Sequence, residues 1–159
     1  MTRRPKAMEE SEQMSSLDVR GLPSCPTHLR RTIREAVNSA FREHGVASHA
    51  VSITFVSDRE MTELNRKALG RKGTTDVIAF DLSEKGLPYA KVGDVYISLD
   101  RARASGARFA VSCREEIIRL VVHGILHIIG YMDDTPARRR KMEACQETIV
   151  RNQVRTRIE

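Results

Sequence analysis

The sequence predicts an α+β fold, a single domain in which one mixed sheet of about four strands packs against about five helices. Three observations predict this fold. Short alternating segments rich in β-branched residues are interspersed with longer amphipathic segments, as in chains that combine strands and helices. One helical segment is apolar almost all round and should be buried. The length of 159 residues suits one hydrophobic core.

Four segments are expected to form strands, because they alternate apolar and polar side chains or concentrate β-branched residues. The first is the weakest of them. They span residues 17–21, 51–56, 76–82 and 93–98. Between the last two, residues 84–91 contain Gly86 and Pro88 and are expected to form a loop.

Five segments are expected to form helices, each preceded by a residue able to cap it. They span about 28–44, 58–69, 100–108, 113–129 and from 136 into the basic C-terminus. The expected N-terminal signals are Thr27, Ser57 or Asp58, Asp100, Ser112 with Glu115 as a capping box, and Pro136. Gly45 and Gly130 are expected to end helices.

No internal repeat or domain linker is visible. Residues 1–16 are expected to form a flexible tail, and residues 17–159 a single domain. The basic residues Arg3, Arg4 and Lys6 are followed by no apolar stretch, which argues against a secretory signal. No apolar run reaches the length of a membrane span, so no membrane association is expected.

The composition favours a polyanionic partner without proving one. Lys and Arg total 27 against 21 Asp and Glu, a formal charge of +6, although an ordinary basic surface explains the same excess. Only 4% of residues are aromatic, which argues against a base-stacking sheet. The three cysteines form no CxxC pair, which excludes a thiolate zinc knuckle and favours a reducing, cytoplasmic setting.

Two histidines interrupt the apolar helix. His123 and His127 lie one turn apart on the same face, a spacing at which two imidazoles can bind one metal ion. The alternative is a pair of core or surface histidines, which is weaker because each imidazole in an aliphatic helix needs a hydrogen-bond partner. Gly130 lets the chain turn back, so Asp133 is the preferred third ligand; Asp134 competes, with a cap of the last helix as its other role.

The residue between the two histidines argues against one class of enzyme. Zinc metalloproteases carry H-E-x-x-H, in which the glutamate is the general base. Gly124 stands at that position here, so the helix offers two ligands and no base. A peptidase of that type is therefore a weak interpretation.

The stretch His-Gly-Ile-Leu-His-Ile-Ile-Gly-Tyr-Met-Asp, from His123 to Asp133, resembles the signature of the YbeY family of bacterial metal-dependent endoribonucleases, also described as rRNA maturation factors. Further segments follow in the family's order: 51–58, 63–65, 75–80 and 93–98. The resemblance covers about residues 51–147. The histidine signature is long and specific, whereas the strand motifs are individually weak and jointly strong.

The resemblance implies a zinc-dependent endoribonuclease directed at single-stranded RNA, acting in 16S rRNA 3′-end maturation, ribosome biogenesis and ribosome quality control. It implies one divalent ion per chain, Zn²⁺ first and Ni²⁺ or Mn²⁺ as alternatives. The expected partner is RNA, 16S rRNA or small-subunit precursors, with a small-subunit ribosomal protein or a ribosome-assembly GTPase as candidate protein partners. The expected location is the cytoplasm.

The chain departs from the family pattern at two positions. Most members carry a third histidine where this chain has Asp133, and a branch of the family uses aspartate there. Most members also carry an arginine, thought to be functional, at the position aligned with Leu69. Arg71 is a candidate to replace that arginine, with a solvated loop residue as the equal alternative.

Other residues are expected to support RNA cleavage. The basic side chains before the third expected strand are candidates to hold RNA phosphates: Arg66, Lys67, Arg71 and Lys72. Asp76 either orients a group in the active site or caps the loop. The run 138–141 is interpreted as a solvated face of the last helix. Two alternatives to the nuclease stay open: a non-catalytic, metal-binding ribosome-assembly factor, and a different metallohydrolase such as a peptidase.

Overall fold

The computed structural model describes residues 15–22, 27–108 and 111–155. Most of the tail expected at residues 1–16 lies outside the described residues, and strand β1 already begins at Ser16. The elements follow the chain in this order: β1 (Ser16–Arg20), α2 (Thr27–Glu43), β2 (Ser48–Val56), α3 (Asp58–Leu69), β3 (Val77–Asp81), β4 (Ala90–Ser98), α4 (Leu99–Arg108), α5 (Cys113–Ile129) and α6 (Pro136–Arg155).

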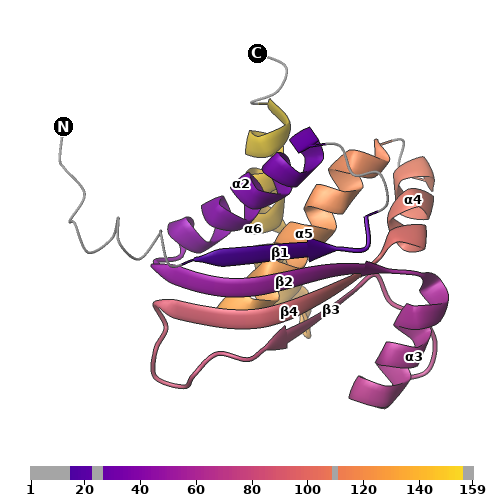
Figure 1. Ribbon diagram of the computed structural model, residues 1–159, viewed down its shortest axis with the longest axis horizontal. Helices are drawn as coiled ribbons and strands as arrows, with labels where there is room; N and C mark the ends of the chain where they lie inside the picture. Colours follow the sequence, from indigo (N-terminus) through magenta and orange to yellow (C-terminus); the bar gives the residue numbers. More distant parts are fainter. Residues whose placement is uncertain (1–14, 23–26, 109–110, 156–159) are drawn as a thin grey trace.

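The four strands form one mixed sheet in the order β1-β2-β4-β3. Strands β1, β2 and β4 run parallel, and β3 pairs antiparallel with β4 at the edge. This confirms the expected α+β fold, with five helices in the part of the chain that the structure describes. Figure 1 shows the sheet with the helices α2, α4, α5 and α6 gathered on one side of it.

Strand β4 corrects two sequence-based expectations at its two ends. The last two residues of the expected loop 84–91 belong to strand β4, which begins at Ala90. The reason is that β2 and β4 pair from Ser48↔Ala90 to Val56↔Ser98. Asp100 does not cap α4. The Ser98 hydroxyl accepts the Arg101 N–H at 3.2 Å, and the Asp100 carboxylate instead accepts the Asp58 N–H at 2.8 Å.

Other helix boundaries follow the predicted signals. The Ser57 hydroxyl accepts the Glu60 N–H at 3.2 Å, which makes Ser57 rather than Asp58 the cap of α3. The Ser112 hydroxyl accepts the Glu115 N–H at 3.0 Å and caps α5. Gly130 closes α5 with φ of +124°, a value that favours glycine. The expected buried, apolar helix is also confirmed, because most residues of α5 between Glu116 and Ile128 are buried.

Helix α5 forms the centre of the domain. It contacts β3 and β4 on one side and α2, α4 and α6 on the others. The contact with the sheet is close at Gly124, where an added Cβ would lie 2.5 Å from Cγ1 of Val95. Gly124 therefore lets the helix axis approach the strand. This contact determines which face of α5 packs on the sheet and which faces do not. No described helix is long and apolar enough to cross a membrane.

The contact at Gly124 gives a first prediction. Gly124→Ala should lower the free energy of unfolding by about 1–3 kcal/mol, because the added methyl group overpacks against Val95. In a Val95→Ala background the clash is removed, and the same substitution should be neutral or stabilising by up to about 1 kcal/mol through helix propensity. Urea unfolding of the four proteins in the cycle measures both values. Equal costs of Gly124→Ala in the two backgrounds would show that the helix and the strand are not in tight contact there.

Candidate metal centre

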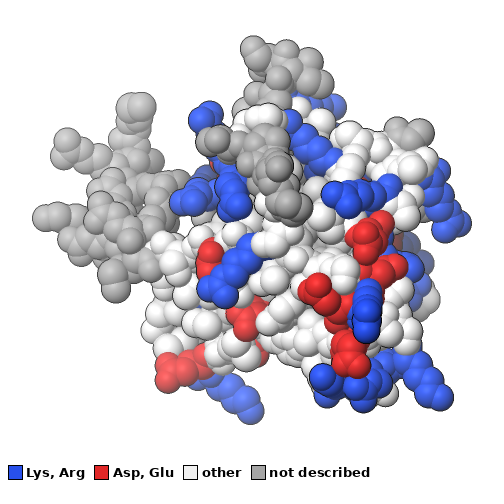
Figure 2. Space-filling model, turned by 45° about the vertical axis from the view of Figure 1, so that its right-hand side comes forward, with Lys and Arg blue, Asp and Glu red and all other residues white. Residues whose placement is uncertain are grey.

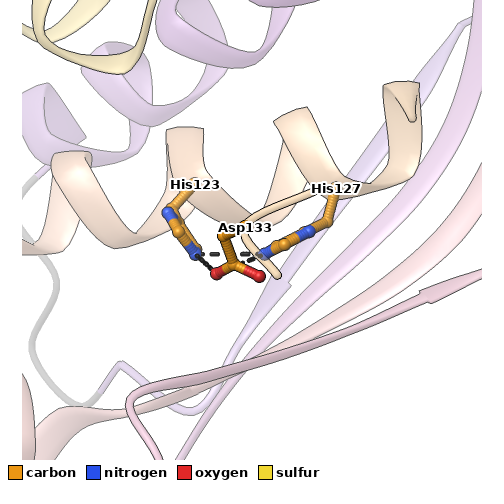
Figure 3. A group of neighbouring side chains, drawn as sticks. All are labelled: His123, His127 and Asp133. Atoms are coloured by element: carbon orange, nitrogen blue, oxygen red, sulfur yellow. Dashed lines mark hydrogen bonds and ion pairs between the residues drawn. The ribbon is translucent and has the colours of Figure 1, made fainter. Parts of the chain in front are cut away.

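The last turn of α5 and the loop after it bring three potential ligands together. The Gly130 and Tyr131 N–H groups both donate to the Leu126 carbonyl, at 3.1 and 2.9 Å, so the chain folds back under the helix end. Asp133 then faces His123 and His127, and Figure 3 shows its carboxylate between the two imidazoles. The sequence-based grouping of these three residues is thus matched by their positions.

The distances between these donor atoms suit one tetrahedral ion. Nε2 of His123 and Nε2 of His127 are 3.1 Å apart, and Oδ2 of Asp133 lies 3.7 and 3.5 Å from them. A tetrahedral zinc ion with bonds of about 2.0–2.1 Å separates its ligands by about 3.3 Å. The triangle therefore needs only small adjustments to hold such an ion.

Hydrogen bonds fix the tautomer of both imidazoles. Nδ1 of His127 lies 3.0 Å from the Tyr131 carbonyl, which can only accept, so this Nδ1 carries the proton. Nδ1 of His123 lies 2.7 Å from Oε1 of Gln146. The amide of Gln146 is oriented by its own Nε2, which donates to the Glu147 carboxylate at 3.3 Å, so its oxygen faces His123.

Both Nε2 atoms consequently present lone pairs to each other and to a carboxylate oxygen. Three converging electron-pair donors repel one another unless a cation lies between them, which is the arrangement of a metal centre. Burial lowers the pKa of His123 and favours the neutral, ligating form. The two imidazole nitrogens and one carboxylate oxygen fit zinc and related divalent ions.

Asp134, the competing ligand, points elsewhere. Both oxygens of its carboxylate accept hydrogen bonds from Nη1 of Arg138, each at 3.0 Å, and this pair is exposed. It is not the cap of α6 either, because the Thr135 hydroxyl accepts the Arg138 N–H at 3.2 Å. Asp133 is therefore the carboxylate that the fold brings to the histidines.

The three residues line an open cleft of about 690 Å³. Arg71, Asp76 and Leu69 line the same cleft from the loop before β3 and from the end of α3. That loop is held in place, because Nδ2 of Asn65 donates to the Gly73 carbonyl at 3.0 Å and the Arg71 N–H donates to the Asn65 carbonyl at 3.2 Å. The position of Arg71 at the cleft is thus built into the local structure.

The remaining candidates have other surroundings. Arg66 and Lys67 pair with the exposed carboxylate of Glu63, at 3.1 and 3.2 Å, and like Lys72 are not among the residues lining the cleft. Figure 2 shows basic side chains at the lower end of one face, where α3 lies in Figure 1. Asp76 accepts Nε of Arg101 at 2.6 Å, which joins the start of β3 to α4. Contact of Arg66, Lys67 or Lys72 with RNA stays a prediction.

Two further residues at the site, Gln146 and Arg119, are not among those predicted from the sequence. Gln146 is buried on the apolar face of α6, in helical register with Met142 and Ile149, and a polar residue at such a position signals a buried partner. Arg119 lies one turn before His123 and lines the cleft, where it donates to Glu147 at 2.7 and 3.1 Å and to Glu116 at 2.8 Å. The hydrogen bond from Arg119 holds the pKa of Glu147 below its usual range.

Fold and site together define a class: a single-domain α+β protein with a candidate three-ligand metal centre at an open cleft. A family model described as Endoribonuclease YbeY matches residues 22–153. The chain belongs to the YbeY family, as its sequence motifs suggested.

Several relatives named Endoribonuclease YbeY support this assignment. The protein of Moorella thermoacetica is 39% identical over 77% of this chain and 85% of its own length. The protein of Halalkalibacterium halodurans is 35% identical over 74% of this chain and 82% of its own length. The solution structure of TM1509 from Thermotoga maritima superposes with a TM-score of 0.62, covering 87% of this chain and 89% of its own. At 24% identity that structure supports the fold alone.

The hydrogen bond from His123 to Gln146 gives a second prediction. Gln146→Ala should weaken zinc affinity by about 10–100-fold, because the Nδ1 proton of His123 loses the partner that orients the ring. Gln153→Ala, the same change on the same helix two turns away, should bind zinc like the wild type. Competition with a chromogenic chelator measures the affinities. Equal zinc affinity of the wild type and Gln146→Ala would remove Gln146 from the site.

Proposed function

We propose that this protein is a metal-dependent endoribonuclease that hydrolyses single-stranded RNA. The observation that carries the proposal is the convergence of His123, His127 and Asp133 at an open cleft, in a member of the YbeY family. Three protein ligands leave one position for water or substrate, which is typical of catalytic rather than structural zinc sites. The name Endoribonuclease YbeY of the relatives supports RNA as the substrate.

The chemistry that a bound divalent ion supplies is an acidified water and stabilisation of charge on a phosphoryl oxygen. The residues of the chain prepare for it in specific ways. His123 and His127 are held with their Nε2 lone pairs directed toward Asp133, which adds a negative charge. Because a carboxylate replaces the family's third imidazole, the net charge of the site is lower by one, and the site accepts harder ions such as manganese more readily.

Arg71 is the residue proposed to bind the scissile phosphate. It lines the cleft with the three ligands, and the arginine that most family members carry is Leu69 here. A guanidinium donates two parallel hydrogen bonds to a phosphate, so it positions the substrate and offsets charge. Asp76 is proposed as a positioning residue that keeps the loop before β3 joined to Arg101 of α4.

The geometry argues against a peptidase. The position of the metalloprotease general base is Gly124, and an added Cβ there would meet Val95 and Val77 of the sheet. A glutamate at this position would enter the core rather than the cleft. The non-catalytic assembly factor stays as the second candidate, because the basic composition fits it as well as it fits the nuclease. Turnover of RNA with and without a chelator separates the two.

The biological setting belongs to the same proposal. We infer a role in 16S rRNA 3′-end maturation and ribosome quality control in the cytoplasm, with zinc as the resident ion. A small-subunit ribosomal protein or an assembly GTPase would bring the enzyme to its RNA. The family assignment supports this setting, and the net charge of +6 suits a partner rich in phosphate.

The third prediction concerns Arg71. Arg71→Ala should reduce RNA affinity and cleavage rate about tenfold through the loss of a charged hydrogen bond, and it should leave the metal content unchanged. The slope of log affinity against log salt should also fall by about 0.7. The measurements are anisotropy and cleavage of a labelled single-stranded RNA over a salt series, with and without chelator.

Arg140→Ala is the control, since Arg140 is exposed on α6 outside the lining of the cleft. If Arg71→Ala cleaves as fast as the wild type, Arg71 is a solvated loop residue. If the metal-loaded wild type does not cleave RNA and chelator changes nothing, the protein is not a metal-dependent nuclease, and the assembly-factor role takes its place.

A further inference from the structure

A second hollow is lined by the residues that lead from the end of α5 to Asp133. Its volume is about 490 Å³, which is enough for a nucleotide. It is lined by Ile129, Gly130, Tyr131, Met132, Arg138 and Lys141. Asp133 lines the metal cleft and its neighbour Met132 lines this hollow, so the two share one short loop.

The lining combines an apolar floor with two cations. Ile129, Tyr131 and Met132 provide the apolar part of the lining, and Met132 is 52% exposed, one of five exposed large apolar residues in the described part of the chain. A thioether is polarizable and makes favourable contacts with aromatic rings, so the exposed Met132 offers a surface for a flat base. Arg138 and Lys141 extend from the first turns of α6, where their charges would meet a phosphate.

The two cations are not equivalent. Nη1 of Arg138 donates to both carboxylate oxygens of Asp134 and lies 3.7 Å from the sulfur of Met132, so the charge of Arg138 is partly offset. Within the described part of the chain Lys141 forms no ion pair. Lys141 is therefore the group with a full charge to offer to a ligand.

We propose that this hollow is a subsite for the nucleotide next to the scissile phosphate, with its base on Met132 and Tyr131 and its phosphate at Lys141. The inference rests on the proposed nuclease function, because a strand that crosses the metal loop would place adjacent nucleotides on its two sides. A base can enter the hollow only when it is unpaired, so the subsite would by itself select single-stranded RNA. The run 138–141 then acts through one residue instead of serving only as a solvated face.

The first test measures binding without cleavage. A labelled single-stranded RNA whose bridging 5′ oxygens are replaced by methylene groups, which keeps the phosphate charge and prevents hydrolysis, is titrated with wild type, Lys141→Gln and Arg140→Gln, all metal-loaded, over a salt series. Lys141→Gln should bind about tenfold more weakly than the wild type, and its salt slope should be lower by about 0.7. Arg140→Gln removes one positive charge from the residue that precedes Lys141 and should bind like the wild type, since Arg140 does not line the hollow. Equal affinities of the two variants would overturn the subsite.

The second test locates the nucleotide. Single abasic ribosides are placed at successive positions around the cleaved bond, and kcat/KM is measured for each substrate. One adjacent position should cost the wild type about tenfold, and Met132→Ala should lose this penalty at that position only, with its metal content unchanged. A uniform loss at all positions would mean that Met132 only supports the loop, which overturns the base-binding role. If the wild type cleaves no RNA, the proposed function fails, and the binding comparison of Lys141→Gln with Arg140→Gln still decides whether the hollow holds a nucleotide.

Discussion

The close contact between Gly124 of α5 and Val95 of β4 is the constraint on which the site depends. The helix can lie this close to the sheet only because position 124 has no side chain. With one face of α5 held against β3 and β4, His123 and His127 must turn toward the sheet edge, where β3 and the loop before it form the opposite wall of the cleft. The same contact takes the position of a metalloprotease base into the core.

From this placement the electrostatics of the site follow. The Nδ1–H of His123 donates to Gln146, and the Nδ1–H of His127 donates to the Tyr131 carbonyl. Both Nε2 atoms therefore present their lone pairs before any ion binds. The walls nearby are rich in carboxylates: Asp76, Asp81, Glu116 and Glu143 line the cleft. A polyanion can approach such a wall only where cations offset it, which gives Arg71 and the metal ion complementary roles in the proposed path of the RNA, while Lys141 would act in the neighbouring hollow.

Local signals were enough to predict the sheet, the buried helix and the three potential ligands, because periodicity, caps and the spacing of His123 and His127 are properties of short segments. Features that depend on tertiary pairing were not predictable in this way. The start of β4 is determined by its ladder with β2, and the cap of α4 is Ser98 because Asp100 is engaged by Asp58. Gln146 on α6 contacts His123 on the neighbouring helix α5, and only the polar side chain of Gln146 on an otherwise apolar face indicated a partner.

X-ray absorption spectroscopy of the zinc-loaded protein determines whether His123, His127 and Asp133 hold one divalent ion. We expect a four-coordinate shell of light atoms at about 2.0–2.2 Å, with the multiple scattering of two imidazoles in the wild type and of one in His127→Ala. A sulfur scatterer at about 2.3 Å, or an unchanged imidazole count in His127→Ala, would show that the ion is bound by other residues.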